Sequence, residues 1–450
     1  MNRTQNFKKS KNQGQEHRGF LTSSSLVRKF SFLLKREYLI LFIIFLFELF
    51  LRFYQMDLKN PFGYDQVDNA WAAKNIIVNH WFPLVGFEAK GNTGIYIGPV
   101  YYYLISFFYW IFNLNPIASG VFAGLTSIFT FWVIFYVSKK LFFTEVALIA
   151  VFINTFIFSA ILFDRVQGPV NFIPGISILI FYFLYKIITG NSKYIIALSL
   201  VIGFSFQIHF TSVFLPLIVI LSLPFFPKNK QTIKYILISI PLFLIWLIPN
   251  AIAQIKQGNS QASHLTNYIN TYYHGFHLRR VIQLAGDGLI QFSPYLFMDK
   301  LTQLKFIAFP LFFIIFLYKS ISREKLIFCY LVLLWFVVPW FVFATYSGEI
   351  SDYYFSVNRF IALFIISYFF ARVWMIKNII PKIAVLIILI YIAITNLINF
   401  LPYKDTGLAD RERTVLQAIS QGKRIEFQQG VPESYLYYYF MRQKGVDVYD

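Results

Sequence analysis

Apolar runs close to 20 residues long recur along most of this chain, from about residue 37 to residue 400. That length is what an α-helix needs to cross the roughly 30 Å hydrocarbon layer of a bilayer. Hydrophobic residues make up 57% of the chain and charged residues only 14%, which leaves no room for a sizeable soluble core. Only helices and closed barrels satisfy their own backbone hydrogen bonds in lipid. We therefore expect an all-α, polytopic membrane protein.

The formal net charge of +19 comes from Lys and Arg in short connectors between apolar runs. No basic stripe lies on a polar domain, so nucleic acid is not expected as a partner. Such connectors orient membrane spans instead, with the basic ones on the cytoplasmic side. The basic and polar residues 1–36 are predicted to form a disordered cytoplasmic tail, followed by a retained anchor that lacks a cleavage site. Cys329, the only cysteine, lies in an apolar span, which excludes an intramolecular disulfide and a cysteine-based metal site.

Charge bias and run length predict the organisation of the chain. Residues 37–400 form the membrane domain, with a first outer loop at 55–98 and a large outer loop at 253–300. An interfacial helix is expected within 67–80, and the short tyrosine-rich run 99–113 is assigned to the interface or to a re-entrant position.

Two further runs are unusual for single crossings. Residues 142–162 are predicted to be one span, whereas 194–226 is too long for one span and short for two. Because lysines flank the second run on both sides, it is predicted to be a shallow helical pair with Gln207 and His209 at its tip. Residues 401–450 are then extracytoplasmic and hold a helix near 410–420 and a SYLYYYF segment, which indicates a small soluble stub or an interaction tail.

Polar residues gather in the outer loops that this topology defines. Asp65 and Asp68 lie in GYDQVDNAW directly after the first span, and carboxylates are costly near a bilayer unless they line a watery site. The loop that follows the 142–162 run brings Asp164, Arg165 and Asn171 to the same face. No P-loop, GxGxxG or HExxH pattern occurs. Any chemistry on the outer face must therefore use an activated lipid.

Six motifs in order carry a resemblance to a known family: GYDQVDNAW, WFPLVG, GPVYYYL, FDRVQGPVNFIP, FSFQIHF and VNRF. In this order the chain resembles the C-type (GT-C fold) glycosyltransferases that use polyprenyl-phosphate sugars, within the protein O-mannosyltransferase and aminoarabinose transferase branch. The resemblance implies a bundle of about 11 transmembrane helices with interfacial helices in the first outer loop. It also implies inverting transfer of a hexosyl or pentosyl group in the plasma (inner) membrane of the cell envelope. The implied partners are a polyprenyl-phosphate-linked sugar donor, membrane lipids and a lipid, glycan or protein acceptor.

One position departs from the family pattern. Many relatives place Glu directly after the first-loop Asp, where this chain has Gln66. Hard divalent cations prefer several carboxylate oxygens, so this change weakens the case for a tightly bound metal. No cofactor is predicted with certainty, and a divalent metal with Asp65 and Asp164 as candidate ligands stays an open alternative.

Glycosyl transfer from a lipid phosphate needs a base for the acceptor's proton and positive charge for the departing phosphate. Asp65 is the predicted base, with a solvated loop carboxylate or a helix cap as the alternative, and Asp68 is expected to orient it or to cap the helix. The predicted contacts to the donor phosphate or sugar are Arg359, His209, Arg165, Asn171 and Gln207. For Arg359 the alternative is interfacial snorkelling, for His209 a hydrogen-bonded core position, and for Arg165 a topology charge.

The large outer loop also carries basic residues, namely His264, His274, His277, Arg279 and Arg280. Their irregular spacing favours a solvated loop that covers substrate over a metal site. Two other classes of protein compete with the transferase. A lipid-linked glycan flippase or transporter would show inverted half-repeats and charges in mid-span. A polysaccharide polymerase or ligase would concentrate its functional residues in a late outer loop.

Overall fold

The computed structural model describes residues 36–88, 93–256, 260–273, 275–290, 304–318, 321–405 and 407–449. The chain divides into two units, Met1–Ile43 and Ile44–Asp450. The first unit is described only from Arg36, where helix α2 begins, and the second holds all other helices.

The described residues are almost entirely helical, and β structure in them is limited to isolated bridges. The first helices are α2 (Arg36–Phe53), α3 (Met56–Lys59), α4 (Tyr64–Ile77), α5 (Val100–Ile111), α6 (Ile117–Leu141), α7 (Thr144–Phe156), α8 (Phe158–Arg165), α9 (Ile173–Ile188) and α10 (Tyr194–Phe206). They are followed by α11 (Phe214–Ser222), α12 (Lys230–Lys256), α13 (Ser260–Tyr272), α14 (Leu278–Ile290), α15 (Leu304–Leu317), α16 (Arg323–Ala344), α17 (Arg359–Trp374), α18 (Ile379–Phe400), α19 (Leu408–Ser420) and α20 (Pro432–Gln443). Short 3₁₀ turns include η1 (Pro169–Phe172), η2 (Phe210–Val213) and η6 (Asp352–Val357). The predicted all-α membrane fold is confirmed.

Among the described residues, 5 helices are long and apolar enough to cross a membrane, namely α6, η1 with α9, α12, α16 and α18. Their environments differ, because 72% of the apolar stretch in Pro169–Ile188 is buried but only 11% of that in α12 and 17% of that in α18. The central helix thus packs against protein, while α12 and α18 present apolar surface suited to lipid. The count of about 11 transmembrane helices stays a prediction.

The run 142–162, predicted to be one span, is broken instead. Ile157 is extended (φ −67°, ψ 123°), and α7 and α8 meet there at an angle of 70°. Such a break frees a backbone N–H that helix hydrogen bonding no longer uses. The freed N–H of Phe158 donates to Asn396 Oδ1 of α18 at 2.8 Å.

The run 194–226 folds as the predicted pair of short helices, α10 and α11, with Gln207 and His209 at the break between them. The described parts of the large outer loop form two helices, α13 and α14. His274 and residues 291–300 of that loop lie outside the described residues.

The first outer loop pairs with itself through its backbone. The N–H of Gly86 donates to the carbonyl oxygen of Ile97 at 2.8 Å, and the N–H of Ile97 donates to that of Phe87 at 3.2 Å. A Cβ atom on Gly86 would lie 2.4 Å from the carbonyl oxygen of Gly98, so only glycine allows this close approach. The loop thereby holds Phe87 in a fixed position between α5 and the α10–α11 break.

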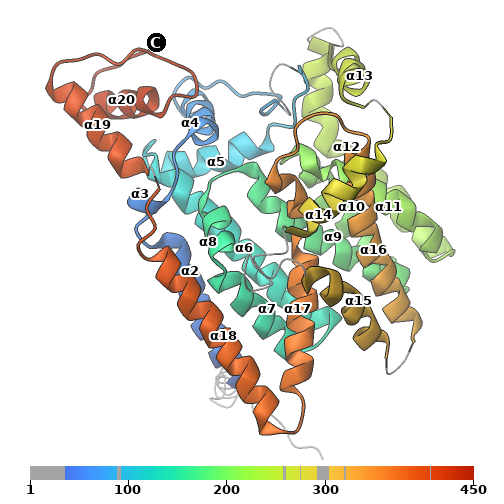
Figure 1. Cartoon of the computed structure of the whole chain (residues 1–450). Coiled ribbons are helices and arrows are strands. Elements are labelled where there is room, and N and C mark those ends of the chain that lie inside the picture. Colours follow the sequence, from blue (N-terminus) through green and yellow to red (C-terminus); the bar gives the residue numbers. More distant parts are fainter. Residues whose placement is uncertain are drawn as a thin grey trace, which may run out of the picture. The chain divides into compact units, whose positions relative to one another are not determined.

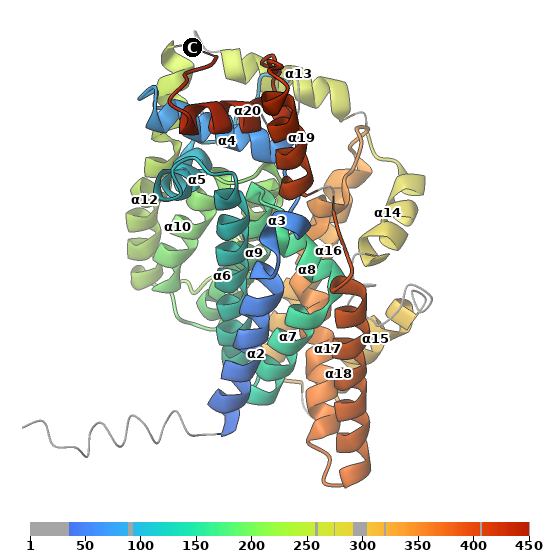
Figure 2. The same cartoon turned by 90° about the vertical axis from the view of Figure 1, so that its left-hand side faces the viewer.

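The last residues fold back onto the first outer loop. We call residues 407–449, which contain α19 and α20, the C-terminal cap. The predicted helix near 410–420 is present as α19. α19 packs against α3 and α20 against α4, and both views show α20 beside α4 (Figures 1 and 2). The cap is thus part of the packed structure of the second unit.

Substitution of Gly86 by Ala is expected to destabilise the protein by about 1–3 kcal/mol, the usual effect of forcing an extra methyl group into a tight contact. The reason is the clash with the backbone oxygen of Gly98, because a backbone atom cannot rotate away as a side chain can. Gly168→Ala is the matched control, since the nearest atom to its added Cβ lies at 3.8 Å. Thermal unfolding in detergent measures both, and equal melting temperatures for the two variants would contradict the prediction.

Candidate functional site

Helix α4 carries the acidic pair, and local hydrogen bonds fix where it begins. Gly63 is extended (φ −114°, ψ −161°), and its N–H donates to Gln66 Oε1 at 2.9 Å, which caps the first turn. Gln66 Nε2 donates to the carbonyl oxygen of Gln167 at 2.5 Å. Gln66 therefore joins the first outer loop to residues 164–171, which we call the second outer loop. The two loops are in contact, as the topology predicted.

Asp65 lies in the first turn of α4 with an accessible side chain. No hydrogen bond or ion pair to its carboxylate is present among the described residues, whereas its backbone oxygen accepts from Asn69 Nδ2 at 2.5 Å. Desolvation by the surrounding protein raises the pKa of Asp65, and the charge of Asp68 raises it further. A carboxylate that is accessible, unpaired and raised in pKa has the properties of a general base.

Asp68 follows one turn later and is held by α5. The hydroxyl of Tyr102 donates to Asp68 Oδ2 at 2.9 Å. Burial raises the pKa of Asp68, while this hydrogen bond opposes the rise. Burial also raises the pKa of Tyr102, so at neutral pH its hydroxyl keeps the proton that it donates.

A row of aromatic rings connects the acidic pair to His209. The ring of Phe87 lies 6.5 Å from that of Tyr102 and 6.1 Å from the imidazole of His209, measured between centroids. His209 in turn contacts Tyr353 of η6 edge-on at 5.8 Å. The structure therefore brings Asp68 and His209 to opposite ends of this row of aromatic rings.

His209 lines a cavity of about 50 Å³ whose other lining residues are mostly tyrosine and phenylalanine. Its Nδ1 accepts the backbone N–H of Thr211 at 3.2 Å, and this leaves Nε2 as the nitrogen that carries a proton in the neutral ring. The tyrosines that line the cavity are Tyr268, Tyr273, Tyr346, Tyr353 and Tyr354. A protonated Nε2 and tyrosine hydroxyls form a donor-rich surface suited to oxygen-rich groups.

Three of the residues predicted to contact the sugar donor make hydrogen bonds to backbone carbonyls. Arg165 donates to the oxygens of Leu51 and Tyr54, at 2.8 and 2.9 Å, near the end of α2. Asn171 Nδ2 donates to the carbonyls of Phe163 and Val166, at 2.9 and 2.6 Å. Gln207 Nε2 donates to the carbonyl of Trp246. All three side chains are buried, so in this conformation they hold the backbone around the site. Their contact with a donor stays a prediction.

Arg359 is the first residue of α17 and is partly accessible. Its guanidinium carbon lies 4.9 Å from the ring centroid of Phe163 in α8. The carbonyl of Phe163 also accepts from Asn171, so Arg359 sits beside the second outer loop. Three predicted positions of the site, Arg359, Asn171 and Asp164, thus surround or adjoin Phe163.

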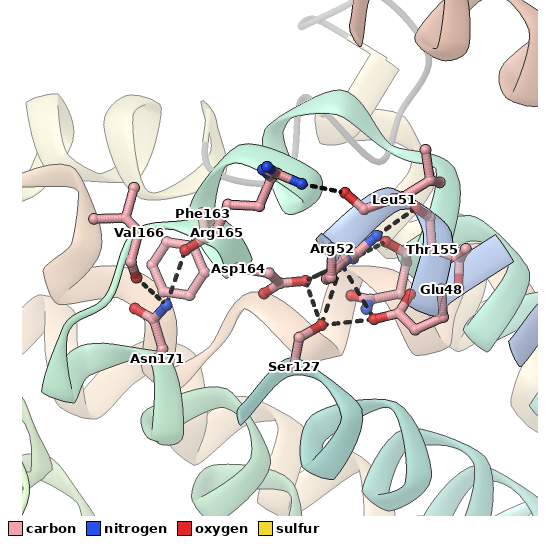
Figure 3. Close-up of polar contacts among 11 residues, drawn as sticks. Glu48, Leu51, Arg52, Ser127, Thr155, Phe163, Asp164, Arg165, Val166 and Asn171 are labelled. Carbon is pink, nitrogen blue, oxygen red and sulfur yellow. Dashed lines mark hydrogen bonds and ion pairs between the residues drawn. The ribbon is translucent and has the colours of Figure 1, made fainter. Parts of the chain in front are cut away.

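A buried ion cluster, which the sequence did not lead us to expect, connects four helices (Figure 3). Arg52 of α2 pairs through Nε with Glu48 Oε1 at 3.1 Å and through Nη2 with Asp164 Oδ2 at 2.6 Å. Ser127 of α6 donates to both carboxylates, at 2.6 and 3.1 Å. Arg52 Nη1 also donates to the carbonyl of Thr155 in α7 at 2.7 Å. The signal was in the sequence, since Glu48 and Arg52 are ionisable residues four apart in an apolar run.

The metal alternative finds no support in this geometry. Asp164, one of its two candidate ligands, is engaged by Arg52 and Ser127, and Asp65 is not part of that cluster. Among the described residues, no three or more His, Cys, Asp or Glu side chains gather as a metal site would require. His264 and His277 of the large outer loop do not form such a group either.

The described helices form an apolar bundle with an acidic pair on a short helix of its first outer loop, which is the architecture of a multi-pass membrane protein. The family model described as dolichyl-phosphate-mannose-protein mannosyltransferase matches residues 97–252. The crystal structure of ArnT from Cupriavidus metallidurans bound to undecaprenyl phosphate is similar, with a TM-score of 0.56 and 10% sequence identity over 88% of this chain and 74% of ArnT. The apo structure of the same ArnT gives a TM-score of 0.51 and 11% identity with the same coverage. No curated protein sequence matches the chain.

The predicted GT-C fold is thereby confirmed. The structural likeness, at 10–11% identity, concerns the fold. Within that fold the acidic pair on α4 and the second outer loop are joined by Gln66 and Gln167.

Replacing Arg52 by Met is expected to cost about 3–5 kcal/mol of stability, because it leaves Glu48 and Asp164 buried without a counter-charge. The matched control is Arg411→Met, which removes a partly exposed ion pair with Glu433 and should cost roughly 0–1 kcal/mol. Thermal unfolding in detergent compares the two variants.

Replacement of all three charged residues of the cluster by apolar residues provides a second test of the same role. A triple variant with Glu48→Leu, Arg52→Met and Asp164→Leu should lose less stability than Arg52→Met alone, because no buried charge remains unpaired. If Arg52→Met unfolds at the temperature of the Arg411→Met control, the cluster does not have the structural role described.

Proposed function

We propose that this protein is an integral membrane glycosyltransferase, which moves a sugar from a polyprenyl-phosphate donor to an acceptor on the extracytoplasmic face. Three findings support the proposal: the GT-C fold, the family-model match at residues 97–252, and the position of Asp65 on α4. The ArnT structure with undecaprenyl phosphate supports a donor of the same lipid class. The single observation that carries the chemistry is the accessible and unpaired carboxylate of Asp65 beside Asp68.

In the proposed reaction, the acceptor's hydroxyl oxygen forms a bond to the anomeric carbon of the donor sugar. The bond between that carbon and the phosphate oxygen breaks, and the polyprenyl phosphate leaves with the electron pair. Asp65 takes the acceptor's proton as general base. Because the nucleophile attacks from the side opposite the leaving group, the configuration at the anomeric carbon is inverted.

The remaining predicted residues divide between orientation and phosphate binding. Asp68, fixed by Tyr102, keeps the first turns of α4 in place and raises the pKa of the base. We assign the departing phosphate to Arg359 and the Nε2–H of His209, since a charged fork and a neutral donor both stabilise an oxyanion. Arg165, Asn171 and Gln207 support the backbone near these groups through the carbonyls that they bind.

Asp65→Asn is expected to lower the transfer rate by about 100-fold or more, which is the usual contribution of a general base. The amide cannot accept the proton, and it avoids the cost of desolvating a charge, so the variant should fold at least as well as the parent. The measurement is transfer from labelled polyprenyl-phosphate sugars by purified protein in detergent.

Asp410→Asn on the exposed side of α19 is the matched control and should transfer at the parental rate. Undiminished transfer by folded Asp65→Asn would disprove the base assignment. Failure of the parent to transfer from any such donor would overturn the proposed function and favour a lipid-linked glycan flippase or transporter, which a lipid-translocation assay in proteoliposomes would detect.

The pH dependence of kcat/KM is expected to show an acid limb with a midpoint above the ordinary aspartate pKa of about 4. The base works only when deprotonated, and its pKa is raised by desolvation and by Asp68. Asp68→Asn removes that neighbouring charge, so the limb should move to lower pH, even if the maximal rate also falls. A limb that stays in place or moves to higher pH in this variant would show that Asp65 does not set it.

A further inference from the structure

Helix α4 is too short and polar to be ordered on its own. It has 14 residues, and an isolated helix of that length is marginal in water. Its order therefore depends on the elements packed against it. One face meets α5, where Ala72 and Ile76 pack with Tyr102. A second face, which carries Tyr64, Trp71 and Lys74 at helical spacing, meets the C-terminal cap.

Trp71 is the centre of the contact with the cap. Its ring lies 5.1 Å from that of Tyr435, 5.4 Å from Tyr438 and 5.3 Å from Phe427, with a further contact to Tyr449 at 6.2 Å. Edge-to-face and tilted pairs at these distances are favourable beyond the area they bury. Trp71 Nε1 is buried without a hydrogen-bond partner among the described residues, so the side chain acts through packing alone.

The cap is itself anchored to neighbouring parts of the first outer loop and to the end of α5. Tyr435 is fully buried, and its hydroxyl donates to the carbonyl of Leu114 at 3.0 Å. Gly430 has φ +73° and lies so close to Tyr64 that an added Cβ would be 2.1 Å from the ring. Tyr64 directly precedes Asp65, so the cap reaches the residue adjacent to the proposed base.

We propose that Trp71 is a positioning residue through which the C-terminal cap holds α4, and with it the carboxylate of Asp65, in the geometry that transfer requires. The inference rests on the proposed function for its effect on rate. The structural part, that the cap orders α4, holds whatever reaction the protein performs. The cap then acts on catalysis only through its contact with α4, and it provides no group that touches substrate.

The test compares four single-substitution variants of the whole chain with the parent protein. Trp71→Ala and Tyr435→Ala should lower kcat by about 10- to 100-fold, the loss expected when a reacting group is displaced by roughly 1 Å, with donor KM within about twofold of the parent. Trp71→Phe keeps an aromatic ring and loses no hydrogen bond, so it should recover most of kcat. Leu416→Ala, at an exposed position of α19, should leave kcat unchanged.

Hydrogen exchange measured by mass spectrometry gives a second readout that does not require activity. Peptides from 64–77 should exchange faster in Trp71→Ala and Tyr435→Ala, while peptides of the buried helix α9 stay protected. If Trp71→Ala fails to fold, Phe427→Ala removes one exposed ring from the same contact and should show the same effects more weakly.

Each combination of results decides the proposal. Parental kcat and unchanged exchange of 64–77 in the folded variants would overturn it, and so would a loss of protection spread equally over all helices, which would indicate a general stability effect. If the parent protein transfers no sugar, the proposed function fails, but faster exchange of 64–77 in Trp71→Ala would still support the positioning of α4 by the cap.

Discussion

The structure of the second unit depends on a guanidinium buried between two carboxylates. Arg52 connects α2 to α6, α7 and α8, because Glu48, Ser127, Asp164 and the carbonyl of Thr155 all bind it or its partners. Moving these charges out of water costs several kcal/mol for each ion, and that cost is offset only when every group finds its partner. The cluster therefore admits one arrangement of these helices. It fixes the end of α8, from which Gln167 of the second outer loop reaches Gln66 on the helix of the acidic pair.

The polar residues around the site fall into two sets, one buried and one at least partly accessible. One set binds backbone carbonyls and is buried: Arg165 near the end of α2, Asn171 in its own loop, and Gln207 at the break after α10. The other set is at least partly accessible, namely Asp65, Asp68, His209 and Arg359. Irregular backbone at membrane depth leaves amides and carbonyls unpaired, and buried side chains must satisfy them. The accessible set contains the residues to which the proposed function assigns the base, its neighbour and the phosphate contacts.

The sequence predicted the fold class, the helical pair at 194–226 and the contact of the first two outer loops, because apolar run length, charge bias and motif order depend on local composition. It did not predict the break at Ile157, whose cost is offset by a distant residue, Asn396. It also missed the pairing of Arg52 with Asp164, which lie 112 positions apart. For the cap it left a small soluble stub or an interaction tail as alternatives, since nothing in SYLYYYF reveals the contact with Trp71. Contacts between remote segments were therefore the part that composition and spacing could not supply.

Asn396 has a consequence for how chains of this kind can vary in length. It holds α18 in one register against α8. Just beyond Asn396, at the end of α18, the carbonyls of Phe400, Leu401 and Tyr403 accept hydrogen bonds from Lys59. Because both attachments fix its ends, the length of the segment between them determines where the cap begins. The lipid-facing side chains of α18 can be exchanged for other apolar residues at little cost, but an inserted or deleted residue would rotate the helix by about 100° and break one attachment. Related sequences should thus tolerate substitution there and exclude gaps.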